Sequence, residues 1–147
     1  MTVRAKGVTV AATLSDNLKR VLDGKAFVTL ATIQPDGSPQ ASPVWVKRDD
    51  GQLLMSTTIR RRKYQNLTRD PRATVVVIDH DQPYRYAQLR GTVELTRDGA
   101  DELIDDLARK YTGKASYAEF NPAAAQDAPR VVLRFTPERV TGQGDLA

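Results

Sequence analysis

The sequence predicts a mainly β domain with short helices, in which six strands form one closed or nearly closed antiparallel barrel. Six runs rich in β-branched or alternating residues are bounded by turn residues. Two turn signals, Pro35-Asp36-Gly37 and Asp49-Asp50-Gly51, connect the first three runs. The chain has 147 residues, of which 40% are hydrophobic, so it is long enough for one domain with a real core.

The N-terminal part predicts an arm followed by a helix. Met1 to Leu14 has no periodic pattern, so we expect a loose arm on a single domain that spans residues 1–147. Ser15 is a suitable N-cap, apolar residues follow at helical spacing, and Gly24 is a suitable stop. These features predict a helix over Asp16–Asp23.

The strands are expected in two groups. Residues 26–33, 38–47 and 52–58 predict an antiparallel meander through the two turns. Residues 72–79, 84–95 and 129–139 predict the remaining strands, with a bulge at Gly91 in the long one.

Two further helices are expected between these strands. A short helical pattern follows the third strand and ends at Asp70-Pro71, because the ring of Pro71 disfavours helical geometry at Asp70. Residues 98–111 predict a longer helix, with acids early and bases late as the macrodipole prefers. Residues 112–128 are expected to form a loop of small residues.

The composition excludes several classes of chemistry. No cysteine is present, so disulfides, a thiolate nucleophile and a thiolate metal site are excluded. The single His80 argues against a histidine metal cluster or a Ser-His-Asp site, and we expect no metal. A net charge of +4 indicates anionic ligands without requiring nucleic acid. No apolar run is long enough for a membrane span or a signal peptide, so a cytoplasmic protein is expected, with no membrane partner.

Four consecutive cations, Arg60 to Lys63, stand at the predicted start of the short helix. They repel one another, and the macrodipole adds positive charge there. An anion such as phosphate would make the arrangement favourable, with help from hydroxyls of Thr57 and Thr58 and from free helix N–H groups. The alternative is a solvated basic face on a surface helix.

The order of motifs around this run resembles the split β-barrel flavin and deazaflavin oxidoreductases. A hydroxyl-rich strand end precedes Arg-x-Lys and then Asn-Leu-x-x-Asp-Pro-Arg-Ala at residues 66–73, and residues 31–40 resemble the first hairpin of that superfamily. The superfamily includes pyridoxamine 5′-phosphate oxidase and the actinobacterial enzymes that depend on coenzyme F420. The resemblance spans residues 15–140. It implies a split barrel that forms a homodimer with two cofactor sites at the interface.

The resemblance also implies roles for individual residues. Lys63 and Arg61 match the phosphate-binding Arg-x-Lys, while Arg60 either reaches the anionic tail of a deazaflavin or is solvated. Asn66 either binds phosphate or caps a loop. The residues expected to face the cofactor ring, or to lie near the cofactor or the dimer seam, are Gln40, Ser42, Pro43, Val44 and Tyr84.

The activity expected from this resemblance is hydride transfer from reduced F420 to a conjugated organic substrate. The cofactor carries such chemistry, and no catalytic residue can be named from the sequence. The Arg-x-His pair that binds pyridoxal phosphate in the true oxidases is missing, which disfavours that activity. Two alternatives remain: an FMN-binding oxidoreductase on the same fold, and a flavin or haem-type binder without catalysis.

Overall fold

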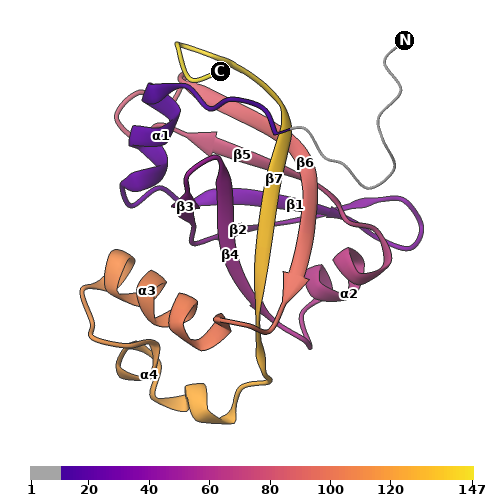
Figure 1. Ribbon diagram of the computed structural model, residues 1–147, viewed down its shortest axis with the longest axis vertical. Coiled ribbons are helices and arrows are strands. Elements are labelled where there is room, and N and C mark those ends of the chain that lie inside the picture. The colour runs from indigo at the N-terminus through magenta and orange to yellow at the C-terminus, as the bar shows by residue number, and fades with distance from the viewer. Residues whose placement is uncertain (1–10) are drawn as a thin grey trace.

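The computed structural model describes residues 11–147, and in this part of the chain seven strands form one antiparallel sheet (Figure 1). The strands are β1 (Val28–Ile33), β2 (Pro39–Val44), β3 (Lys47–Asp49), β4 (Gln52–Thr58), β5 (Arg72–Ile78), β6 (Tyr86–Thr96) and β7 (Arg130–Gln143). Their order is β2-β1-β5-β6-β7-β4-β3. The expectation of six strands is therefore wrong, and the sheet is not closed between its edge strands β2 and β3.

The expected meander of three strands is also wrong, because residues 38–47 do not form one strand. β2 pairs with β1, whereas β3 pairs with β4 at the opposite edge of the sheet. The chain crosses between them at Trp45 and Val46. Val46 is fully buried in the main core, while Trp45 packs against a second apolar cluster. The strand is interrupted here because the chain leaves its pairing with β1 after Val44 and begins pairing with β4 at Lys47.

The first helix, α1 (Asp16–Asp23), is confirmed with the expected bounds. The Ser15 hydroxyl accepts from the Leu18 N–H (3.1 Å), and Leu18 and Leu22 are fully buried in the main core. Residues 1–10 of the expected arm lie outside the described residues. Beyond them, the Ala12 N–H donates to the Pro137 carbonyl (2.7 Å) and Leu14 is buried, so residues 11–14 pack onto the domain.

The main core lies inside the curled sheet and under α1. It contains Leu30, Met55, Val75, Leu89 and Phe135, all fully buried. Complete burial of one such side chain contributes about 1.5–3 kcal/mol. A register shift does occur at Gly91, between Arg90 and Gly91, but the extra residue, Glu138, lies on β7 and not on the strand where the bulge was expected.

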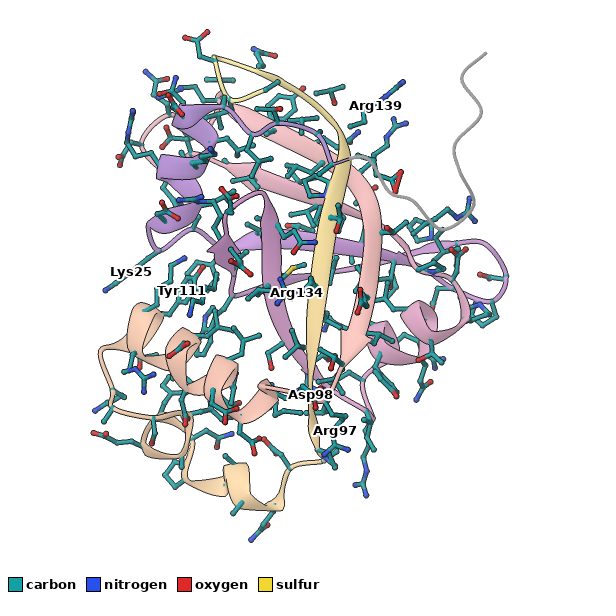
Figure 2. All side chains as sticks on the ribbon, in the orientation of Figure 1. Lys25, Arg97, Asp98, Tyr111, Arg134 and Arg139 are labelled. Carbon is teal, nitrogen blue, oxygen red and sulfur yellow. The ribbon has the colours of Figure 1, made fainter. Side chains whose placement is uncertain are left out.

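A second apolar cluster lies between the sheet and α3 (Ala100–Thr112), and it positions the site described below. α3 begins two residues later than expected because Gly99 forms its N-cap at φ 76°. Its buried face contains Leu103, Ile104 and Leu107. Figure 2 shows Tyr111 at the end of α3, against the sheet.

Two short helices occupy the segment expected to be a loop. They are α4 (Tyr117–Phe120) and the 3₁₀ helix η1 (Pro122–Gln126). The Ser116 hydroxyl caps α4 by accepting from the Glu119 N–H (3.2 Å), and Asn121 caps η1 in front of Pro122. The Ser-x-x-Glu spacing is a signal for a helix start that the sequence analysis passed over.

Candidate functional site

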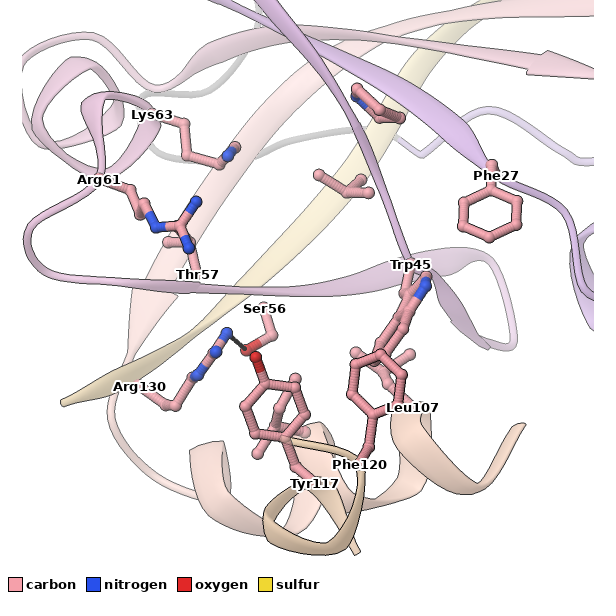
Figure 3. A pocket seen from close by; sticks show the side chains of 13 residues that line it. Phe27, Trp45, Ser56, Thr57, Arg61, Lys63, Leu107, Tyr117, Phe120 and Arg130 are labelled. Atoms are coloured by element: carbon pink, nitrogen blue, oxygen red, sulfur yellow. Dashed lines mark hydrogen bonds between the residues drawn. The ribbon is translucent and has the colours of Figure 1, made fainter. Parts of the chain in front are cut away.

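A pocket of about 290 Å³ opens between β2 and β4 and is covered on one side by α3 and α4 (Figure 3). It is lined by Phe27, Pro43, Val44, Trp45, Ser56, Thr57, Arg61, Lys63, Ile104, Leu107, Tyr117, Phe120 and Arg130. Arg61, Lys63 and Thr57 lie at one end, and aromatic and aliphatic side chains, with Ser56 and Arg130, form the rest of the wall. Such a lining suits a planar ligand with an anionic group.

Two strand edges without a partner border the pocket. β2 pairs only with β1 in the described sheet. β3 reaches no further along β4 than Leu54, so the segment from Met55 to Thr58 pairs with β7 alone. Strand edges of this kind carry backbone N–H and C=O groups that seek partners. The pocket can therefore offer donors and acceptors to a ring that carries carbonyl and N–H groups.

The cationic end is built by the start of α2 (Arg62–Arg69). Arg61 is its N-cap residue, no side chain caps the helix, and no acid lies in its first turn. Among the described residues, no carboxylate pairs with Lys63 or Arg61. Burial, and then the nearby charge of Arg61, lower the pKa of Lys63. An anion placed here would relieve this repulsion and use the free N–H groups.

The Thr57 hydroxyl adds an unused polar group at the same end. Thr57 is 3% exposed, and its Oγ1 has no hydrogen-bond partner. A buried polar atom without a partner costs about 1–3 kcal/mol. Because Thr57 lines the pocket beside Arg61 and Lys63, a bound anion can accept a hydrogen bond from the Thr57 hydroxyl.

The apolar part of the wall is aromatic. Trp45 stacks on Tyr111 with ring centroids 5.3 Å apart and planes inclined by 7°, and Phe120 meets the Trp45 ring edge-on at 5.5 Å. Tyr111 holds this wall to the sheet, because its hydroxyl accepts from the Val46 N–H (3.1 Å) and donates to the Ala26 carbonyl. Phe27, which follows Ala26, also contacts the Tyr111 ring.

Arg130 approaches the pocket from the start of β7. Its guanidinium carbon lies 4.6 Å from the centroid of the Tyr117 ring, a cation–π contact. One nitrogen lies 3.5 Å from Ser56 Oγ, and another lies 3.6 Å from a carboxylate oxygen of Asp127. Arg130 thus places a nearly buried cation beside the aromatic wall.

The structure brings five of the residues predicted from the sequence together in this pocket. They are Pro43, Val44, Thr57, Arg61 and Lys63. Six others lie outside its lining, namely Gln40, Ser42, Thr58, Arg60, Asn66 and Tyr84.

Asn66 and Gln40 are engaged with one another through Thr32. The Asn66 amide donates to Thr32 Oγ1 (3.0 Å), whose hydroxyl donates to Gln40 Oε1 (2.9 Å). Asn66 is fully buried. This chain of hydrogen bonds attaches α2 to the hairpin of β1 and β2, and so positions Lys63 and Arg61 instead of adding to the pocket wall.

The other four predicted residues have different surroundings. Tyr84 is 81% exposed between β5 and β6, and Arg60 is exposed before α2. Thr58 is buried beyond the end of the pocket. The Ser42 hydroxyl is buried without a hydrogen-bond partner on the same face of β2 as Val44.

Most of the aromatic wall was not predicted from the sequence. Tyr117 and Phe120 lie in the segment expected to be a loop, Phe27 was placed in a strand with no role, and Arg130 was placed in the last strand. These residues are distant in sequence and meet only because α3 and α4 fold back over β4. The one available signal was the small helix cap at Ser116, which fixes the position of the two rings.

Two absences apply to residues 11–147. No cluster of three or more His, Cys, Asp or Glu side chains is arranged to hold a metal ion there. In the same residues, no helix has the length and apolar character needed to span a membrane.

An antiparallel sheet that stays open between its edge strands is the arrangement of a split barrel. A family model described as pyridoxamine 5′-phosphate oxidase matches residues 14–144. The chain belongs to the pyridoxamine 5′-phosphate oxidase family, as the sequence resemblance predicted.

Solved structures agree with this assignment. A protein named F420 reductase has 32% sequence identity and a TM-score of 0.75, over 87% of this chain and 98% of that chain. A conserved hypothetical protein from Mycobacterium tuberculosis has 23% identity and a TM-score of 0.70, over 95% of this chain and 89% of that chain. A putative pyridoxamine 5′-phosphate oxidase from Listeria innocua has 18% identity and a TM-score of 0.65, over 86% and 95%. The last two support the fold alone.

Proposed function

We propose that this protein binds coenzyme F420 and, with the cofactor reduced, reduces a conjugated organic substrate. One observation carries the proposal. At one end of a pocket with an aromatic wall, Lys63 and Arg61 have no carboxylate partner among the described residues, and beside them the buried Thr57 hydroxyl has no hydrogen-bond partner. The similarity to an F420 reductase at 32% identity supports the deazaflavin over other cofactors of this fold.

The cationic end of the pocket fits a phosphodiester. Lys63 and Arg61 supply charge-assisted donors, and the start of α2 supplies backbone N–H groups without a capping side chain. Thr57 supplies a hydroxyl donor from β4. These groups belong to two elements that the Asn66–Thr32–Gln40 chain and the sheet hold in fixed positions.

The part of the pocket beside the free edges of β2 and β4 fits a flat ring. The free edges of β2 and β4 offer backbone hydrogen bonds, and Pro43 and Val44 on β2 face the pocket together with Trp45. Reduced F420, when held there, would supply the hydride, and a proton from water would complete the reduction of one conjugated double bond of the substrate. The residues of the chain bind, orient and shield the reactants, since no paired acid and base lines the pocket.

The choice between F420 and FMN depends on charge beyond the phosphate. FMN ends at one phosphate, whereas F420 continues into a lactyl-oligoglutamate tail with several carboxylates. Arg60 and Arg62 are exposed beside the phosphate-binding pair and can meet these carboxylates. Exposed pairs of this kind contribute about 0.2–1 kcal/mol each, so the preference is modest and falls with salt.

We also propose that the protein is a homodimer in which the partner subunit completes the pocket. A volume of about 290 Å³ is small for a site that must hold a cofactor and a substrate. Next to it, the unpaired edge strand β2 exposes Pro39, Ala41 and Pro43 on one face. Sedimentation at micromolar concentration is expected to give a dimer, and a stable monomer would contradict this part of the proposal.

The direct test compares protein purified from two hosts, one that makes F420 and one that does not. Protein from the first host is expected to carry the absorption of F420 and, once the cofactor is reduced, to consume a conjugated acceptor. Protein from the second host is expected to acquire both properties when F420 is added. A yellow FMN complex from both hosts, unaffected by added F420, would favour the FMN alternative.

A further inference from the structure

We propose that Arg130 and Ser56 bind a carboxylate carried by the substrate, so that the enzyme accepts planar conjugated acids in preference to neutral compounds of the same shape. This inference rests on the proposed function, because it assigns the second half of the same pocket. It concerns residues that the phosphate site does not use.

The side chain of Arg130 is nearly buried, with 14% of its surface exposed. Its guanidinium packs on the Tyr117 ring, with Ile104 and Leu107 lining the same part of the pocket. A cation in an apolar setting is stabilised when an anion pairs with it, since the surrounding low dielectric strengthens the interaction. The guanidinium of Arg130 therefore favours an anionic ligand.

The donors of Arg130 are poorly used by the protein itself. A guanidinium has five N–H donors in a fixed plane. Within residues 11–147, the polar contacts of this side chain are Ser56 Oγ at 3.5 Å and an Asp127 oxygen at 3.6 Å. Both distances exceed the range of about 2.7–2.9 Å for a charge-assisted hydrogen bond. The guanidinium can thus receive a carboxylate on two donors, with the Ser56 hydroxyl as a third.

Arg130 is separate from the phosphate site because the two lie on opposite sides of β4. Consecutive residues of a strand face opposite ways, so Ser56 and Thr57 point to different faces. Figure 3 shows Ser56 with Arg130 and Tyr117 on one side of the β4 ribbon, and Lys63 and Arg61 on the other. A phosphate held at Lys63 leaves the donors of Arg130 available.

The neighbouring wall selects the shape of the ligand. Tyr117, Phe120 and Trp45 contact one another through their rings, with centroids 5.5–6.4 Å apart. Flat apolar surfaces of this kind bind aromatic or conjugated groups. A ligand with a carboxylate at Arg130 and a planar unsaturated skeleton would therefore match both the guanidinium and the aromatic wall.

The test measures binding of trans-cinnamate and methyl trans-cinnamate, which share the conjugated skeleton and differ in charge. Calorimetry on protein saturated with oxidised F420 gives dissociation constants without turnover. We expect the wild type to bind cinnamate at least tenfold more tightly than the ester. Arg130→Gln should remove this preference and keep the affinity for the ester, while Arg130→Lys should retain part of the preference because the charge remains.

Lys63→Ala, measured with enough F420 for saturation, is the matched control and should keep the carboxylate preference. Equal affinities for acid and ester in the wild type, no binding of either, or a preference that survives Arg130→Gln would overturn the inference. A dependence of F420 affinity on tail length that disappears in Arg130→Gln would also overturn it, because the carboxylate would then belong to the cofactor.

The inference and the proposed function fail in different ways. F420 that binds in a Lys63-dependent manner without any carboxylate preference would remove the inference alone. Failure of F420 to bind the wild type would remove the proposed function first. Circular dichroism and thermal unfolding of each Arg130 variant establish that its fold is intact before binding is compared.

Discussion

Lys63 is the residue on which cofactor binding is expected to depend most. It lines the pocket and has no carboxylate partner among the described residues. It also lies in the first turn of α2, where no side chain caps the helix. We expect Lys63→Ala to weaken cofactor binding by roughly ten- to a hundredfold, since a charge-assisted hydrogen bond contributes about 1.5–3 kcal/mol. Titration of cofactor fluorescence measures the change. Arg62→Ala is the control when both variants are titrated with FMN, which has no tail carboxylates. Arg62 is exposed and lies outside the pocket lining, so this substitution should alter FMN affinity little.

The lowered pKa of Lys63 predicts a pH dependence for the same interaction. Burial and Arg61 lower this pKa, so the ammonium is lost at a lower pH than in a free lysine. Phosphate binding needs the ammonium, so affinity should fall as pH rises through the lowered pKa. Lys63→Arg keeps its charge in that range and should bind without this fall. An identical decline in both proteins would show that another group is titrating.

At the scale of elements, Asn66 distinguishes a structural role from a ligand role. Its buried amide joins α2 to the β1–β2 hairpin through Thr32. We expect Asn66→Ala to reduce the free energy of unfolding by about 1–3 kcal/mol, because a buried hydrogen-bond partner is lost. The exposed Gln65→Ala is the control. Thermal unfolding together with cofactor titration decides the matter: unchanged stability with lost affinity would make Asn66 a cofactor ligand, as one sequence interpretation had it.

Lys110 joins three elements and predicts a second pH effect. Its ammonium donates to the Leu22 and Val46 carbonyls, each at 2.7 Å, and burial lowers its pKa from 10.5 to about 8. Between these values the unfolded chain binds more protons than the folded one, so the free energy of unfolding should rise with pH in that window. Below about pH 8 the lysine is charged in both states and the slope disappears.

The comparison that measures this effect uses Lys110→Met, which fills similar space without a titrating group. Denaturant unfolding of the two proteins should show that the wild type gains stability relative to the variant between pH 8 and 9.5. That window ends before Tyr111 titrates, whose pKa burial raises above 10. If the difference in free energy of unfolding between the two proteins stays constant from pH 8 to 9.5, Lys110 is not held in the desolvated position.

The elements that the sequence predicted well are those whose signals are local. α1 has a cap, a periodic apolar face and a glycine stop, and β4 has strand residues between two clear boundaries, so each was predicted with its observed bounds. The break between β2 and β3 was missed because it depends on which strand each segment pairs with, β1 for β2 and β4 for β3. Nothing near these residues in the sequence shows that β3 pairs at the far edge of the sheet.

In the candidate site too, the residues close in sequence were predicted and those brought together by distant segments were not. Arg61, Lys63 and Thr57 are close in sequence, so one motif located the cationic end of the pocket. Phe27, Tyr117 and Arg130 come from three distant segments, and only the packing of α3 and α4 over β4 brings them together. Asn66 and Gln40 have polar side chains that could bind a ligand, but both are hydrogen-bonded to Thr32. Thr32 was not singled out from the sequence.

At the scale of the whole molecule, the open sheet would let a small domain hold the proposed cofactor. The two free strand edges and the start of α2 surround one pocket, and the exposed face of β2 lies beside it. A closed barrel would have used these backbone groups in its own ladder. Under the proposal, the preference between F420 and FMN should depend on how far the positive charge extends from Lys63 towards Arg60.

The measurement that tests the central claim is the affinity for F420 and for FMN at low and high ionic strength, with F420 of short and long tails. We expect F420 to bind more tightly than FMN, with a difference that grows with tail length and shrinks in high salt. Tighter binding of FMN at both ionic strengths, or an F420 affinity that ignores tail length, would contradict it.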